Sequence, residues 1–321
     1  LLLGGLAGLA TGRGDVGAAI AGAGANIAQQ QFFGYTRGNE ESADQAAMEY
    51  LDRTGISARG LLTVLDTLSG QELLVSERQD VYMRTHPLSR DRMSFVRQHV
   101  QDSPYSDEPP DPERERQLAR VQAKLRAFTL PKGRLPRLFD ESDDSVPSRY
   151  GRAIVAHRNA ELEKAIGLMD SLLAEAPQDP YFHELRGQIL FESQRGRDAL
   201  DDYRRAVEIA PDEPQIRIGL AQVEIELNEP ELLRDAVVHL NRVLHEETRN
   251  TFAWRQLAIA YGRLGEEGLS ALCLAEEAAI QGRGEEALRL AKRAAGNLED
   301  GSPAQLRARD LQATVERARK Q

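Results

Sequence analysis

A repeat of 34 residues constrains this chain more than any other feature of its sequence. When the sequence is laid on itself at that shift, Pro177 falls on Pro211. A period of this length is typical of arrays in which each unit is a pair of helices, and such a pair buries its apolar face only by stacking on its neighbours. The repeat therefore predicts a stacked helical array over the second half of the chain.

The unit that starts at Asp179-Pro180 resembles the tetratricopeptide consensus. Its small, aromatic and turn positions are occupied by Gly187, Ala199, Tyr203, Ala206 and Pro211. The small residues let the two helices of a hairpin approach closely, and the aromatic residue fills the hole against the next hairpin. A later unit repeats the W-x2-L-G-x2-Y opening, with alanine for glycine, at Trp254, Leu257, Ala258 and Tyr261.

The neighbouring units keep or vary this register. The unit before Asp179 retains the small and turn residues Ala153, Ala165 and Pro177. The unit from Pro214 to Asn250 is about three residues longer than the 34-residue period, and we place the excess within residues 228–234. The last helix, over residues 303–318, is rich in arginine, as a solubilising cap should be. We therefore assign residues 146–321 to tetratricopeptide repeats with a C-terminal capping helix.

The composition favours an all-α chain. Aromatic residues make up only 5% of 321 residues, whereas helix-forming residues dominate. The formal net charge of -10 argues against a nucleic-acid partner, because phosphate binding depends on clustered lysine and arginine. The single cysteine, Cys273, excludes an intrachain disulfide and is expected to be a small buried apolar side chain.

The front part of the chain is also expected to be helical. A Gly/Ala-rich segment at residues 1–28 contains Arg13 and Asp15, so membrane association is not expected. Helices are predicted from about Asn39 to Arg53, closed by Gly55, and then after Ser57 as an N-cap. A third helix is expected to run through Val81 and end before Pro87, and a fourth to include Arg92, Met93 and Phe95.

Residues 101–145 are expected to link the front part to the repeats. The stretch QDSPYSDEPPDP at residues 101–112 has the composition of a linker. A charged helix from Glu113 to Phe128 follows, and a second proline-containing connection leads to the array.

Two motifs in the front part place polar residues at suggestive spacings. The first reads YTRGNEESAD over residues 35–44, and the second joins His86-Pro87 to Arg92. Residues four apart stack on one face of a helix, so Glu40 and Asp44 share a face. The plain alternative is that Asn39, Glu40 and Glu41 are a helix N-cap and first-turn acids that complement the helix dipole. A lone His-Pro is, by itself, an ordinary loop pair.

Together the two motifs resemble those of the gluzincin zinc metallopeptidases related to CAAX prenyl proteases, in the secreted or periplasmic branch with C-terminal tetratricopeptide repeats. The family pattern Y-[ST]-R-x-x-E-x-x-A-D implies that Glu40 is a zinc ligand and that Asp44 supports the site from the next turn. The pattern H-P-x-x-x-x-R implies that His86 lies at the mouth of the active site, where it gates the cleft or donates to an oxyanion, and that Arg92 braces this segment. Residues 1–100 would then be the C-terminal part of a metallopeptidase domain.

The resemblance also has an important gap. An HExxH helix, which supplies two zinc-binding imidazoles and a general base, is absent, because none of the six histidines has a partner at that spacing. We therefore expect the chain as given to be inactive, as a fragment or a degenerate member.

For the complete protein, the resemblance implies one Zn²⁺ per chain and polypeptide substrates from the cell envelope. It also implies a periplasmic or secreted location, with docking on the outer-membrane assembly machinery through the repeats. Two other functions stay open from the residues alone. One is a non-catalytic scaffold in which the repeats bind proteins, and the other, weaker one is a membrane-anchored adaptor.

Overall fold

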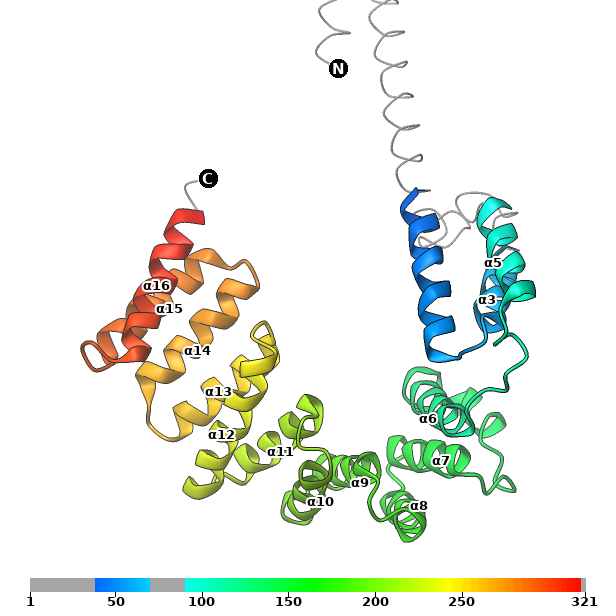
Figure 1. Cartoon of the computed structure of the whole chain (residues 1–321). Helices are drawn as coiled ribbons and strands as arrows, with labels where there is room; N and C mark the ends of the chain where they lie inside the picture. Colours follow the sequence, from blue (N-terminus) through cyan, green and yellow to red (C-terminus); the bar gives the residue numbers. More distant parts are fainter. Residues whose placement is uncertain (1–37, 70–89, 319–321) are drawn as a thin grey trace, which may run out of the picture. The chain divides into compact units, whose positions relative to one another are not determined.

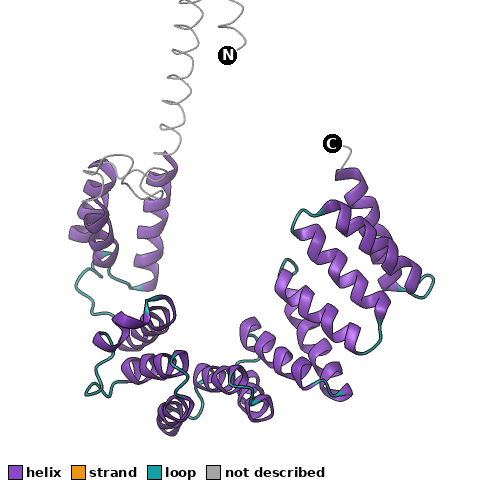
Figure 2. Cartoon of the chain, turned by 180° about the vertical axis from the view of Figure 1, so that it is seen from behind, coloured by secondary structure: helices purple, strands orange, loops and turns teal. Residues whose placement is uncertain are grey.

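The computed structural model describes residues 38–69 and 90–318, and its regular elements there are all helices (Figures 1 and 2). The chain divides into two compact units, Leu1–Glu115 and Arg116–Gln321. The all-α prediction is confirmed for the described part of the chain. Within these same ranges, no helix combines the length and the apolar character needed to cross a membrane.

The first unit contains a helix over residues 38–54, α3 (Arg59–Ser69) and α5 (Arg90–Asp102). The first of these ends at Gly55, whose φ of +66° suits glycine, as predicted. The Ser57 hydroxyl accepts a hydrogen bond from the Arg59 backbone N–H at 3.3 Å. The core of the unit contains Met48, Ala58, Leu65, Val96 and Val100. The helix predicted through Val81 and the Gly/Ala-rich segment lie outside the described residues.

The charged helix predicted after the linker is α6 (Pro112–Thr129), and the 3-10 helix η1 (Lys132–Arg137) follows it. The boundary between the two units lies within α6. Its alanines Ala123 and Ala127 are buried in the same cluster as Tyr150 and Phe182 of the repeats. The small side chains allow α6 to lie close to the first repeat helices.

Five helical hairpins form the rest of the second unit, and each helix packs on the next (Figure 1). The pairs are α7 (Val146–Arg158) with α8 (Leu162–Glu175), α9 (Pro180–Glu192) with α10 (Gly196–Ile209), α11 (Pro214–Leu227) with α12 (Pro230–Glu246), α13 (Thr251–Arg263) with α14 (Glu267–Ile280), and α15 (Gly284–Asn297) with α16 (Pro303–Ala318). The starts of α7, α9 and α11 are 34 residues apart, as the repeat predicts. In the longer unit, the extra residues lengthen α12 to 17 residues, compared with 14 in α10.

The small and aromatic positions of the repeat occupy the predicted places. Ala199 and Ala206 are fully buried, and the Tyr203 ring lies between two glycines of facing helices. A Cβ atom added at Gly187 would come within 2.8 Å of this ring, and one at Gly219 within 2.3 Å. Cys273 is buried as expected, and burial raises the pKa of its thiol to about 12, so this thiol stays protonated at neutral pH.

Candidate functional site

Three of the four residues that the motifs single out meet in the first unit. Glu40 and Asp44 lie on the helix over residues 38–54, and Arg92 lies on α5. The Arg92 Nε and Nη2 atoms donate to the two carboxylate oxygens of Asp44 at 2.6 and 2.9 Å. The Arg92 Nη1 atom lies 2.9 Å from Glu40 Oε2. One guanidinium therefore joins two carboxylates that stand one helical turn apart.

This cluster is buried as well as paired. The side chains of Arg92 and Asp44 are each 7% exposed, and that of Glu40 is 14% exposed. The planar guanidinium matches a carboxylate in a two-bond fork, which is the geometry that makes burial of such charges tolerable. One turn further along their helices lie the core residues Met48 and Val96. The ion pairs thus continue the contact face of these two helices.

The remaining predicted residue, His86, lies outside the described residues. Next to the cluster is a small hollow of about 240 Å³, lined by Glu41, Asp44, Gln45, Asp91, Arg92 and Phe95. Glu41 is exposed, whereas Asp44 is buried. The pairing of Arg92 with both acids is a feature that the motifs did not predict, since they assigned Arg92 to the segment of His86. The four-residue spacing of charged and core residues on both helices was the available signal.

The donor atoms in place fit a zinc site only in part. Among residues 38–69 and 90–318, no group of three or more His, Cys, Asp or Glu side chains is placed to hold a metal ion. Catalytic zinc sites take three protein ligands. Of the ligand set that the resemblance implies, this chain supplies Glu40 alone, and the imidazoles would have to come from an HExxH segment that the sequence does not contain.

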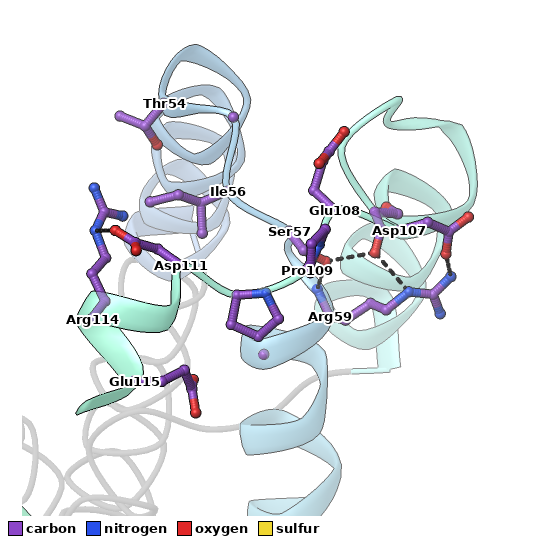
Figure 3. Close-up of a pocket in the computed structure, with 14 residues that line it drawn as sticks. Thr54, Ile56, Ser57, Arg59, Asp107, Glu108, Pro109, Asp111, Arg114 and Glu115 are labelled. Atoms are coloured by element: carbon purple, nitrogen blue, oxygen red, sulfur yellow. Dashed lines mark hydrogen bonds and ion pairs between the residues drawn. The ribbon is translucent and has the colours of Figure 1, made fainter. Parts of the chain in front are cut away.

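A larger hollow of about 820 Å³ lies elsewhere in the first unit (Figure 3). Its walls are the end of the helix over residues 38–54, the start of α3, and residues 106–115. The Ser57 hydroxyl and the Arg59 Nε atom both donate to the Ser106 carbonyl at 2.8 Å. Arg59 and Arg114 are each paired with an aspartate of the same wall. The lining includes no histidine, cysteine or predicted site residue, and its four acidic side chains outnumber its two arginines.

The repeats contain a buried carboxylate that the sequence did not reveal. Glu224 of α11 is fully buried, and neither of its carboxylate oxygens has a hydrogen-bond partner in the described part of the chain. The imidazole of His239 on α12 lies beside it, with Nε2 3.6 Å from Oε1. Burial, together with the negative charge of Asp235, raises the pKa of Glu224 to about 8. Burial and the nearby Arg217 lower the pKa of His239, so both groups favour their neutral forms.

Comparison with known proteins connects the front part to a family of peptidases. Residues 2–100 match peptidase family M48, and residues 150–214 match a tetratricopeptide repeat. The chain therefore carries a segment that matches peptidase family M48, followed by tetratricopeptide repeats, as its motifs predict.

Three curated relatives share one description. The beta-barrel assembly-enhancing protease of Yersinia pestis is 25% identical over 287 residues, which are 87% of this chain and 57% of the relative. The protein of that name from Escherichia coli K12 is 22% identical over 296 residues, with the same coverage. A putative beta-barrel assembly-enhancing protease of Vibrio cholerae is 26% identical over 293 residues, covering 89% of this chain and 59% of the relative. The chain thus spans somewhat more than half the length of these relatives.

The solved structures have lower sequence identity to this chain than these relatives do. A crystal structure of MamA covers 52% of this chain and 94% of its own at 14% identity, with a TM-score of 0.39. A TM-score this low supports no argument about function.

Proposed function

We propose that this chain is the repeat-bearing part of a zinc-dependent metalloendopeptidase of the bacterial cell envelope. The observation that carries the proposal is the match of residues 2–100 to peptidase family M48. The Glu40–Arg92–Asp44 cluster supports it, because these motif residues meet in the structure. Asp44 and Arg92 are 48 positions apart in the sequence. A charged cluster of this kind is costly to bury and needs a reason to persist.

Each residue of the cluster has a role in this proposal. Glu40 is the zinc ligand that this chain contributes. Arg92 holds the Glu40 carboxylate in place and fixes it relative to Asp44, whose two oxygens it also binds. His86 gates the cleft or donates to the oxyanion that develops on the substrate. When bound, zinc would supply an activated water and polarise the peptide carbonyl.

The substrates that we propose are misfolded or assembling envelope proteins, in a periplasmic or secreted location. The support is the shared description of the relatives as beta-barrel assembly-enhancing proteases. The tetratricopeptide repeats would bind the substrate or a partner, such as the outer-membrane assembly machinery, since stacked repeats provide extended surfaces for polypeptides.

A non-catalytic scaffold is the second candidate. Absence of an HExxH segment from the intact gene would favour it, because the 321 residues alone hold one implied zinc ligand instead of three. In that case the repeats carry the function and the front segment is a helical cap.

A protease assay separates the two candidates. We expect the 321-residue chain, incubated with zinc and casein, to show no cleavage above a buffer control. A longer form of the protein that includes an HExxH segment should cleave casein, and chelation of the metal should stop it. Zinc-dependent cleavage by the 321-residue chain that is lost in Glu40→Ala would disprove the need for HExxH. A longer form that binds unfolded casein without cleaving it would favour the scaffold.

A further inference from the structure

Three successive hairpins share a contact between their first helix and the turn before it. In α9, α11 and α13 the fourth residue of the helix reaches the carbonyl oxygen of the residue six positions earlier. The three pairs are His183 Nε2 with Pro177 at 3.1 Å, Arg217 Nη2 with Pro211, and Trp254 Nε1 with Thr248 at 3.0 Å. This contact holds the start of each hairpin to the turn that joins it to the preceding hairpin.

In the hairpin of α11 and α12, a histidine holds Arg217 a second time. The Arg217 Nη1 atom lies 3.1 Å from His239 Nδ1 of α12. A guanidinium has donors only, so Nδ1 accepts and the single proton of the neutral ring is on Nε2. The Nε2 atom faces Glu224, 3.6 Å from its Oε1 atom. The neutral ring of His239 therefore keeps Arg217 in place against the Pro211 carbonyl.

A second proton on His239 removes the acceptor on which this arrangement depends. Both nitrogens of a protonated imidazole donate, so Nδ1–H would face the guanidinium N–H groups, and both groups would carry positive charge. Arg217 must then move away. Its guanidinium is planar and rigid, so this movement also breaks the bond from its Nη2 atom to the Pro211 carbonyl.

The groups around His239 set the pH at which this happens. Burial disfavours the protonated ring, Arg217 and Arg204 of α10 repel it, and Asp235 of α12 attracts it, and together they lower the pKa of His239 from 6.5. Glu224, whose pKa is raised to about 8, is mostly neutral below pH 7 and adds little compensating charge. A histidine whose pKa is lowered in the folded state is neutral at pH 7, and its stabilising contact is lost as pH falls below 6.5.

We propose that His239 and Arg217 form an acid-released clasp, in which a proton from solvent on His239 Nδ1 displaces Arg217 and frees the turn between α10 and α11. Each repeat of such an array contacts only its neighbours, so loosening this turn lets the hairpins on its two sides change their angle. The turn before α13 lacks this response, because the Trp254 indole N–H does not titrate in this range. The proposal concerns the repeats and does not depend on peptidase activity.

Hydrogen exchange at the start of α11 in the 321-residue chain tests the clasp. The Arg217 backbone N–H donates to the Glu213 carbonyl at 3.2 Å, and the Trp254 N–H donates to the Asn250 carbonyl at 3.1 Å in the next hairpin. The protection of each amide is compared at pH 7 and pH 5, after correction for the intrinsic pH dependence of exchange. We expect protection of the Arg217 amide to fall at least about threefold, and that of the Trp254 amide to stay constant.

Three variants assign the response to the clasp. His239→Gln keeps an acceptor for Arg217 but gains no proton, so protection of the Arg217 amide should be the same at both pH values. His245→Gln, at an exposed histidine of the same helix, should respond as the parent does. Arg217→Met lacks the clasp, so protection at residue 217 should already be low at pH 7 and should fall no further at pH 5.

The proposal has clear failing outcomes, and circular dichroism shows which variants are folded. Constant protection of the Arg217 amide in the parent overturns the proposal, as does an equal fall at the Arg217 and Trp254 amides. A fall that persists in His239→Gln overturns it too. If His239→Gln does not fold, a fall that persists at residue 217 in Arg217→Met has the same meaning.

Discussion

The slot that holds Tyr203 makes Gly219→Ala a sharp test of the repeat register. Tyr203 lies on α10, with Gly187 of the same hairpin at one edge of its ring and Gly219 of the next hairpin at the other. A Cβ atom at position 219 would lie 2.3 Å from Tyr203 Cε1 and 2.9 Å from Cζ. The ring has no room to retreat, because Gly187 lies against its opposite edge. The added methyl group must therefore separate the two hairpins or distort the ring.

The expected cost follows from two opposing effects. Overpacking costs typically about 1–3 kcal/mol, and so close a contact with a confined ring belongs at the upper end. Alanine in place of glycine within a helix offsets about 1 kcal/mol of this. The net loss is about 2 kcal/mol, which corresponds to a fall in Tm of roughly 4–8 °C for a unit of this size.

The assay is a thermal melt followed by circular dichroism at 222 nm. Gly167→Ala is the matched control, because Gly167 is exposed within α8 and a Cβ atom there meets nothing within 4 Å. The control should raise Tm by a few degrees through helix propensity alone. The two substitutions are identical in chemistry and should differ in sign.

A double substitution tests the assigned cause of the effect. In a Tyr203→Leu background, Gly219→Ala should cost much less, because the ring that it strikes is gone. If Gly219→Ala raises Tm as Gly167→Ala does, or if its cost is the same with and without the Tyr203 ring, the packing described for this slot is wrong.

Two further predictions concern buried charges. Because Glu224 has a pKa raised from 4.5 to about 8, the folded state keeps a proton that the unfolded chain releases, so stability should fall as pH rises through this window, by up to about 1.4 kcal/mol per pH unit. His239, whose pKa is lowered from 6.5, changes the pH dependence of stability as pH falls below that value, so urea unfolding between pH 6.5 and 8 should report on Glu224. Glu224→Gln should flatten the dependence of the unfolding free energy on pH in this window. An unchanged dependence would refute the assignment. In the first unit, Arg92→Met should cost about 3–5 kcal/mol, because it leaves two carboxylates buried without the guanidinium they share. Arg97→Met on the same helix removes an exposed ion pair with Asp66 and should cost about 0–1 kcal/mol. Hydrogen exchange of α5 measures both effects. An equal response to the two substitutions would contradict the stabilising role of Arg92 in the cluster.

Local sequence patterns were enough to predict the repeats. Pro177 and Pro211 mark the ends of successive hairpins, and Ala199 and Tyr203 occupy positions that only a helix packed on both sides requires. The extra residues near Asn228 were located correctly, but the sequence did not show which conformation they adopt. In the structure Asn228 caps α11 in the left-handed region, so α12 begins at once and the extra residues lengthen it. Length alone does not distinguish a longer helix from a longer loop.

The site was harder to predict because it depends on how helices dock. The motif residues Glu40, Asp44 and Arg92 are visible in the sequence, but the ion pairs among them require two helices separated by more than 30 residues to meet on a particular face. The exposure of Leu118 and Leu125 on α6 was likewise not apparent, since these leucines have the spacing of ordinary core residues. Only the structure shows that Ala123 and Ala127 occupy the buried side instead.

Zinc content is the most direct test of the proposed role of Glu40. The measurement is atomic absorption on a longer form of the protein that carries an HExxH segment, comparing Glu40→Gln with Glu41→Gln. Both substitutions keep side-chain size and remove one charge, but the Glu40 side chain is 14% exposed and paired with Arg92, whereas Glu41 is exposed. A melt of each variant verifies that it is folded. We expect about one zinc per chain in the parent and in Glu41→Gln, and a large loss in Glu40→Gln, since an amide is a poorer zinc ligand than a carboxylate. Retention of zinc by Glu40→Gln, with its loss from Glu41→Gln, would contradict the assignment of Glu40 as the metal ligand.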